Sequence, residues 1–174
     1  MKFTPFNSGL LLGAVSVMMT IILYLMGPQT FAQGWISFAL LIISIALIIY
    51  TGIQYRNTLN EGFLSYQKAY VFLLIVTVVS LPISSLSRVA IMSLDPQFSE
   101  QVVEKSLEAT MEVMSKLGLP DDQVEQAAER ARGDFEEANS LKGALMSLVY
   151  ALPFMLIINL LLALAIRKNK PEFA

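Results

Sequence analysis

The chain contains no cysteine and no histidine. The first absence excludes disulfides, thiol nucleophiles and redox dithiols, and the second removes the usual zinc and haem ligand. Charged residues are also scarce, at 15% of the 174 residues against roughly 25% in soluble domains, whereas 55% of the residues are hydrophobic. The composition therefore predicts no cofactor and no metal site, and it indicates that lipid is the main solvent of the chain.

Long uncharged runs occupy most of the sequence. No Asp, Glu, Lys or Arg occurs in residues 3–55, and two further uncharged runs cover 69–87 and 143–166. A helix needs about 20 apolar residues to cross a bilayer, so the first run can hold two spans and each later run one. We therefore expect an all-α membrane protein with four transmembrane helices, at roughly 8–26, 35–55, 69–94 and 143–166.

The first span has some features of a cleaved signal peptide. A lysine precedes its apolar run, and Thr30-Phe31-Ala32 resembles a cleavage site. The apolar run is longer than the core of a typical signal peptide, however, and a second apolar span follows almost at once. A membrane span is the favoured interpretation.

Charges between the spans predict the topology. One side of the membrane receives two acidic residues, Glu61 and Glu172, and six basic ones, namely Lys2, Arg56, Lys68, Arg167, Lys168 and Lys170. Because short basic loops stay in the cytoplasm, both termini and the loop 56–68 are expected there. The other side receives residues 95–140, which carry twelve acidic and four basic residues, a net charge of −8. The expected organisation is three spans in 1–94, an extracytoplasmic segment in 95–140, and the fourth span with a basic tail in 141–174.

The acidic segment is expected to form an antiparallel helical hairpin. Asp95-Pro96 fits a helix start, Gly118 fits its end, and a second helix can run from Pro120 to about Asn139. Apolar and small residues recur at helical spacing in both helices, which predicts that these two faces pack together. The first stripe is Val103, Leu107, Thr110, Met114 and Leu117; the second is Val124, Ala127, Ala128, Ala131, Phe135 and Ala138.

An acidic ladder, Glu100, Glu104, Glu108 and Glu112, follows the first of these helices at i,i+4 spacing. Like charges at this spacing repel by about 0.2–0.5 kcal/mol per pair. A solvated face is the simplest explanation, and a docking surface for a basic partner or for divalent cations is the alternative. The segment has no cation-loop spacing such as that of the EF-hand.

Two features predict how the spans pack and bend. Gly9 and Gly13 form a GxxxG motif, which allows close helix contact either within the chain or in a homodimer. Pro82 and Pro153 lie inside the third and fourth spans and are expected to kink them, because proline frees a backbone carbonyl.

Three polar residues in the later spans are candidate functional residues. Arg88 is the only charge inside a hydrophobic run, near the outer end of the third span, where a long side chain can reach the interface. A role of Arg88 as an anchor at the membrane interface is therefore favoured over a polar path that it would form with Ser84 and Asn159. The spans contain no carboxylate for a proton relay, and no serine has a histidine base, so no catalytic residue is predicted.

The segment that opens the third span, Gly62-Phe63-Leu64-Ser65-Tyr66-Gln67-Lys68-Ala69-Tyr70, resembles the Gly, Ser-Tyr/Phe, Lys-Ala-Phe signature of the DUF4199 family. Asp95-Pro96, the stretch 111–118 and the closing Arg167-Lys168 are similar to the family as well, so the resemblance covers nearly the whole chain. It implies a four-span bacterial protein of the cytoplasmic (inner) membrane and no known activity. Pro120 stands where the family pattern has a small polar residue.

The leading functional hypothesis is a non-enzymatic membrane protein whose acidic hairpin mediates assembly or partner binding. The organised feature of the sequence is a patterned helical surface rather than a set of reactive groups. The alternative is a small transporter, channel or accessory subunit with a polar path between the third and fourth spans. Besides the lipid bilayer, the expected partners are a protein or a second copy of the chain, and no nucleic acid.

Overall fold

The computed structural model describes residues 3–138 and 140–170. Lys2 and Glu172, which entered the charge count, and Asn139, the expected end of a helix, lie outside these residues. The described part consists of helices and short connections, with one isolated β-bridge. Its helices are α1 (Pro5–Met26), α2 (Pro28–Ala32), α3 (Gly34–Leu59), α4 (Tyr66–Leu94), α5 (Pro96–Lys116), α6 (Asp121–Ala138) and α7 (Leu141–Ile166).

Side-chain oxygens cap the starts of four helices. Thr4, Ser65, Asp95 and Ser140 each accept a hydrogen bond from the backbone N–H three residues later, at the starts of α1, α4, α5 and α7. Such caps satisfy N–H groups that have no partner inside the helix. The helix starts therefore follow directly from the residue types at these positions.

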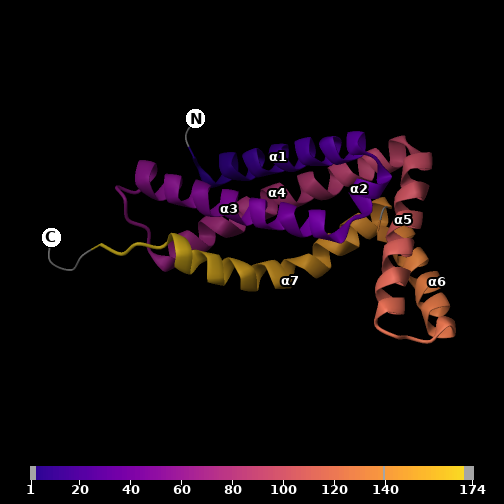
Figure 1. The fold of residues 1–174 in the computed structure, drawn as a ribbon. Helices are drawn as coiled ribbons and strands as arrows, with labels where there is room; N and C mark the ends of the chain where they lie inside the picture. The colour runs from indigo at the N-terminus through magenta and orange to yellow at the C-terminus, as the bar shows by residue number, and fades with distance from the viewer. Residues whose placement is uncertain (1–2, 139, 171–174) are drawn as a thin grey trace.

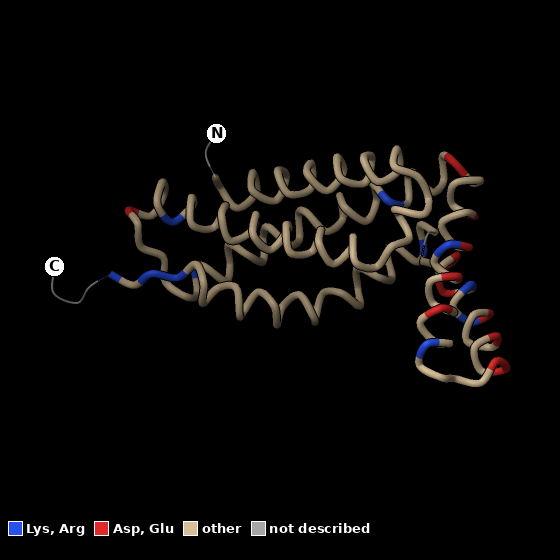
Figure 2. The backbone as a smooth tube through the Cα atoms, in the orientation of Figure 1, with Lys and Arg blue, Asp and Glu red and all other residues tan. Residues whose placement is uncertain are grey.

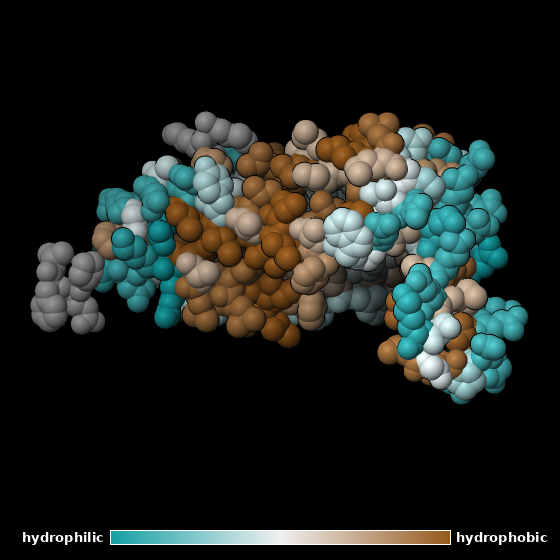
Figure 3. All heavy atoms as spheres, in the orientation of Figure 1, coloured by the Kyte–Doolittle hydropathy of each residue, from teal (hydrophilic) through white to brown (hydrophobic). Residues whose placement is uncertain are grey.

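Four helices, α1, α3, α4 and α7, form a bundle (Figure 1). They have 22, 26, 29 and 26 residues, and each is long and apolar enough to cross a membrane. At 1.5 Å per residue even the shortest exceeds the hydrocarbon thickness of about 30 Å. The surface of the bundle is mainly hydrophobic (Figure 3), as expected for a lipid-facing surface. The four predicted spans are confirmed as helices of this kind.

The short helix α2 joins α1 to α3. Gly27 adopts a positive φ of 98° and ends α1, and Pro28 then stands at the first position of α2. Proline is favoured there because its φ already suits a helix and the missing N–H would have no partner. The connection is thus a short helical turn.

The core of the bundle lies around α4. It brings together α4 with α1 and α7, and its buried residues are Leu12, Leu64, Ala69, Phe72, Leu73, Val76, Ala163 and Ile166. At the end of the bundle near the C-terminus, the backbones of Leu64 and Lys168 exchange two hydrogen bonds of 2.8 Å. Arg56 donates to the last carbonyl of α7, that of Ile166, at 3.1 Å. The loop before α4 and the chain after α7 are therefore joined.

At the other end of the bundle, α5 and α6 lie side by side and crosswise to the bundle (Figure 1). Most of the charged residues lie on this pair (Figure 2). Val103 and Val124, one from each predicted stripe, are buried, but Leu117 is 75% exposed and does not belong to the packed stripe. It is the C-cap of α5, so the helical spacing that predicted its position ends there. Helix α6 begins at Asp121, one residue after the predicted start.

Candidate interaction site on the α5–α6 pair

Asp95 fixes the direction of α5. It ends α4 and caps α5, where one carboxylate oxygen accepts the Phe98 N–H at 2.9 Å. The other oxygen accepts the hydroxyl of Tyr24, on α1, also at 2.9 Å. The Phe98 N–H, and then the Tyr24 hydroxyl, lower the pKa of Asp95 below its ordinary value. An ionised carboxylate therefore connects three helices at this junction.

An aromatic cluster anchors the first two turns of α5. The ring of Phe98 packs edge-on against Tyr24 and against Phe31 of α2, with centroids 4.7 and 5.6 Å apart. Met92 and Val102 complete this small buried core. Such aromatic pairs contribute about 0.5–1.5 kcal/mol each beyond the area they bury. The cluster holds α5 across the end of the bundle.

The side chain of Arg88 lies in the same region as this aromatic cluster. Its guanidinium carbon lies 5.4 Å from the centre of the Phe31 ring, within the range of a cation–π interaction. Arg88 thus lies next to the cluster that holds α5. The sequence identified Arg88 by its charge, whereas Tyr24 and Phe31 were missed; their only signal is that aromatic residues are common near the ends of spans.

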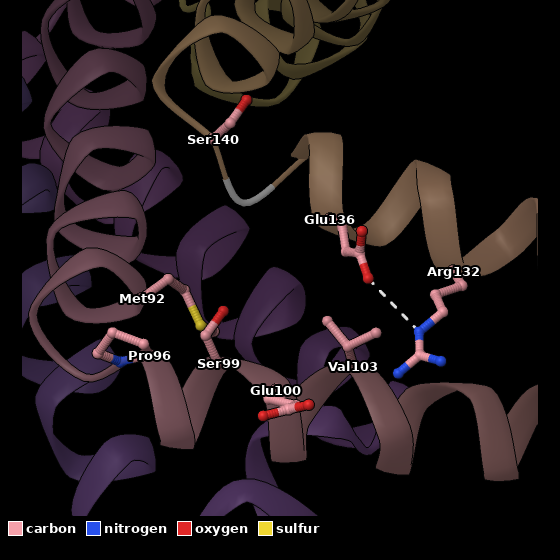
Figure 4. A pocket seen from close by; sticks show the side chains of 8 residues that line it. All are labelled: Met92, Pro96, Ser99, Glu100, Val103, Arg132, Glu136 and Ser140. Atoms are coloured by element: carbon pink, nitrogen blue, oxygen red, sulfur yellow. Dashed lines mark ion pairs between the residues drawn. The ribbon is translucent and has the colours of Figure 1, made fainter.

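A cavity of about 390 Å³ opens between α5, α6 and the adjoining end of the bundle (Figure 4). Two carboxylates, one guanidinium and two hydroxyls line it together with apolar groups; the residues are Met92, Pro96, Ser99, Glu100, Val103, Arg132, Glu136 and Ser140. Arg132 Nε and Glu136 Oε1 are 3.4 Å apart. Beside this ion pair, Glu100 is an acceptor for a cationic group, and Met92 and Val103 are apolar walls for its aliphatic stem.

The acidic ladder is not a uniform row in the structure. Glu100 lines the cavity and Glu104 is exposed. Glu108 forms an ion pair with Lys105, and Glu112 forms one with Lys116, both at 2.6 Å.

Lys116 lowers the pKa of Glu112, chiefly through this hydrogen bond. Exposed pairs of this kind contribute at most about 1 kcal/mol to stability. These ion pairs reduce the repulsion expected along the ladder. Both of them lie in the half of the ladder that is farther from the cavity. Among the described residues, no group of three or more acidic side chains is arranged to hold a metal ion.

Of the residues of the proposed polar path, Ser84 lies one turn before Arg88 on α4, whereas Asn159 is distant from both. Asn159 of α7 is 2% exposed, and its amide donates to the hydroxyl of Thr77 on α4 at 3.1 Å. Ser84 donates to the carbonyl of its own helix at Ser80, at 3.0 Å. Thr77 precedes Arg88 by eleven residues, which is about 16 Å along a helix. Asn159 therefore joins α4 and α7 far from Arg88.

The two glycines predicted to shape the packing lie in a contact between helices, and the two prolines lie inside helices that continue past them. An added Cβ at Gly9 would lie 2.6 Å from Val79 Cβ, and one at Gly13 would lie 2.7 Å from Ile83 Cδ1. Both glycines thus allow close contact between α1 and α4 within the chain. Pro82 and Pro153 lie inside α4 and α7, which continue past them; the proposed kinks stay predictions.

These features define a class: an all-helical protein with four helices long and apolar enough to span a membrane, and a charged helical pair across one end of them. Within that class, the chain belongs to the DUF4199 family, a family of unknown function whose model matches residues 7–168. This match confirms the resemblance seen in the sequence. Comparisons with curated proteins and with solved structures returned no match.

Proposed function

We propose that this chain is a non-enzymatic protein of the bacterial inner membrane that binds a basic protein partner through an extracytoplasmic α5–α6 hairpin. The observation that carries the proposal is the attachment of the acidic pair to the bundle. A net charge of −8 in residues 95–140 is held on helices that Asp95 and the Phe98 cluster tie to the spans. A segment that served only to increase solubility would not need this attachment.

The cavity between α5 and α6 supports a more specific account of binding. A lysine or arginine of the partner can enter it, place its charge between Glu100 and Glu136, and lay its aliphatic stem against Met92 and Val103. Charge complementarity of this kind steers association and selects partners more than it raises affinity. We therefore expect binding that weakens with added salt.

The placement of the hairpin outside the cytoplasm is supported by the distribution of lysine and arginine. Arg56, Lys68, Arg167, Lys168 and Lys170 all lie at the opposite end of the molecule (Figure 2). The positive-inside rule assigns that end to the cytoplasm.

A transporter or channel is the weaker alternative. Its polar path would need Asn159 to be available to solute, whereas this side chain is buried and hydrogen-bonded to Thr77. Its charged group, Arg88, lies several turns away at the end of α4.

Site-directed crosslinking tests the proposal. Because the chain contains no cysteine, Ser99→Cys introduces a single thiol at the rim of the cavity, where a photo-activated crosslinker can be attached. In native membranes we expect one major crosslinked protein, with a yield several-fold lower in Glu100→Gln/Glu136→Gln. The matched control, Glu61→Gln, neutralises an exposed glutamate at the opposite end of the bundle and should leave the yield unchanged. Equal yields in all three chains would refute the proposed site.

A further inference from the structure

Three exposed apolar residues lie close together at the far end of the α5–α6 pair. Val113, Leu117 and Leu119 are 58%, 75% and 39% exposed, although the pair as a whole is rich in charge. Side chains of this kind are unfavourable in water unless another apolar phase covers them.

Their direction follows from helix geometry. Phe98 and Val102 face the bundle, because both belong to the buried cluster with Met92. Val113 lies eleven residues, or about three turns, after Val102, so it shares that face. Leu117 follows Val113 by four residues and is a neighbour on the helix surface. Val113 therefore continues the bundle-facing side of α5, and Leu117 lies at the edge of that side, toward α6.

The bundle covers the bundle-facing side of α5 over the first part of the helix, but not at its end. Lys105, Ala109 and Glu112 line a small cavity with Gln29 and other residues around α2, which places this stretch of α5 over the end of the bundle. The end of the pair extends beyond the bundle in the crosswise direction (Figure 1). Over most of its length α6 lies on the side of α5 away from the bundle, so it does not cover this face.

Lipid surrounds the sides of the four-helix bundle, so any part of α5 that extends past the bundle lies above lipid. A helix crosswise to the spans and next to their ends lies along the membrane surface, with its bundle-facing side toward the lipid. Hydrophilic residues dominate the side of the pair away from the bundle, and hydrophobic residues are exposed among hydrophilic ones at its far end (Figure 3). This is the arrangement of an interfacial amphipathic helix, whose apolar face enters the boundary between headgroups and acyl chains.

We propose that the end of α5, residues 113–119, is a membrane-contact element whose ligand is the lipid surface itself. Val113 and Leu117 enter the interfacial region, and Lys116, which lies five turns after Phe98 and so on the same face, holds its ion pair with Glu112 at the level of the headgroups. The carboxylates of α6 then face away from the membrane. This inference does not depend on the proposed partner, because it concerns the far end of the pair and not the cavity at its attached end.

The test uses single cysteines in the full chain, reconstituted into phosphatidylcholine–phosphatidylglycerol vesicles. Val113→Cys and Met111→Cys are each labelled with an environment-sensitive fluorophore. The two positions lie in the same turn of α5 but on opposite faces, and both side chains are exposed, at 58% and 42%. We expect lipids with a spin label near the headgroup to quench the label at 113 several-fold more strongly than the label at 111. Aqueous iodide should show the reverse order.

Leu117→Cys provides a second position and should behave like Val113→Cys. Equal quenching at 111 and 113, in variants that keep the helical circular dichroism of the parent, would overturn the proposal. Protection from iodide without quenching by the spin-labelled lipids would also overturn it, because the face would then be covered by protein.

Discussion

Replacement of Gly9 by alanine should weaken the contact between α1 and α4. The new Cβ would lie 2.6 Å from Val79 Cβ and 3.1 Å from the carbonyl oxygen of Val76. Neither atom is the far end of a flexible side chain, and ordinary contacts between such atoms are 3.4–4 Å. The helices must therefore separate locally by about 1 Å, and overpacking of this kind costs about 1–3 kcal/mol.

Unfolding in mixed micelles, followed by circular dichroism as the fraction of sodium dodecyl sulfate rises, measures this cost. Gly34→Ala is the matched control, because an added Cβ there meets nothing within 4 Å. Gly13→Ala should have a smaller effect than Gly9→Ala, since the nearest atom there, Ile83 Cδ1, can rotate away and the fixed Ile83 Cβ is 3.0 Å from the added atom. We expect the order of stability to be Gly34→Ala, then Gly13→Ala, then Gly9→Ala.

A double-mutant cycle separates the clash from other effects of the substitution. Val79→Gly removes the opposing Cβ at a cost of about 1 kcal/mol in helix propensity, and Gly9→Ala should then cost much less than it does alone. If Gly9→Ala is as harmless as Gly34→Ala in the parent, the inferred close packing of α1 on α4 is wrong.

Three further predictions concern the polar groups. Thr77→Val and Asn159→Leu should each destabilise the bundle, and the double variant should show a coupling energy of about 0.6–1.7 kcal/mol, as for hydrogen bonds between membrane helices; additive losses would refute the pair. The lowered pKa of Asp95 means that its carboxylate stabilises the fold above the ordinary pKa and loses this effect as pH falls through the lower folded value. Protease sensitivity of residues 95–140 should therefore rise below about pH 4, and Asp95→Asn should remove that pH dependence. Topology reporters after Lys68 should register as cytoplasmic and those near Gly118 as extracytoplasmic; a cytoplasmic signal near Gly118 would refute the orientation.

Local signals were sufficient to predict the helices. Asp95-Pro96 and Gly118 bracket α5, and the uncharged runs bracket the spans, because capping and burial in lipid depend on residue type over short stretches. The boundary errors were small and have local causes. Leu117 was assigned to a stripe by extending the helical period past the cap, and α2 was missed because five residues are too few to show a period.

Contacts between distant segments could not be predicted in the same way. The bonds from Tyr24 to Asp95 and from Asn159 to Thr77 join residues 71 and 82 positions apart. Each was visible only as a polar residue near or within an apolar run, with many possible partners. The crosswise direction of α5 depends on the first of these contacts, so the sequence analysis described an acidic hairpin without its orientation relative to the bundle.

The contacts along α1 link the packing of α1 on α4 at one end of the bundle to the position of α5 at the other end. Gly9, Gly13, Thr20 and Tyr24 recur at spacings of four, seven and four, so they lie on one face of α1. Along this face Gly9 and Gly13 pack against α4, the hydroxyls of Thr20 and Ser87 lie 3.5 Å apart, and Tyr24 reaches Asp95. A displacement of α1 at its glycines is therefore carried, through a rigid helix, to the hydrogen bond that fixes α5. It follows that Gly9→Ala should not only destabilise the bundle but also increase the protease sensitivity of residues 95–140, even though Gly9 lies about 22 Å from Tyr24 along the helix.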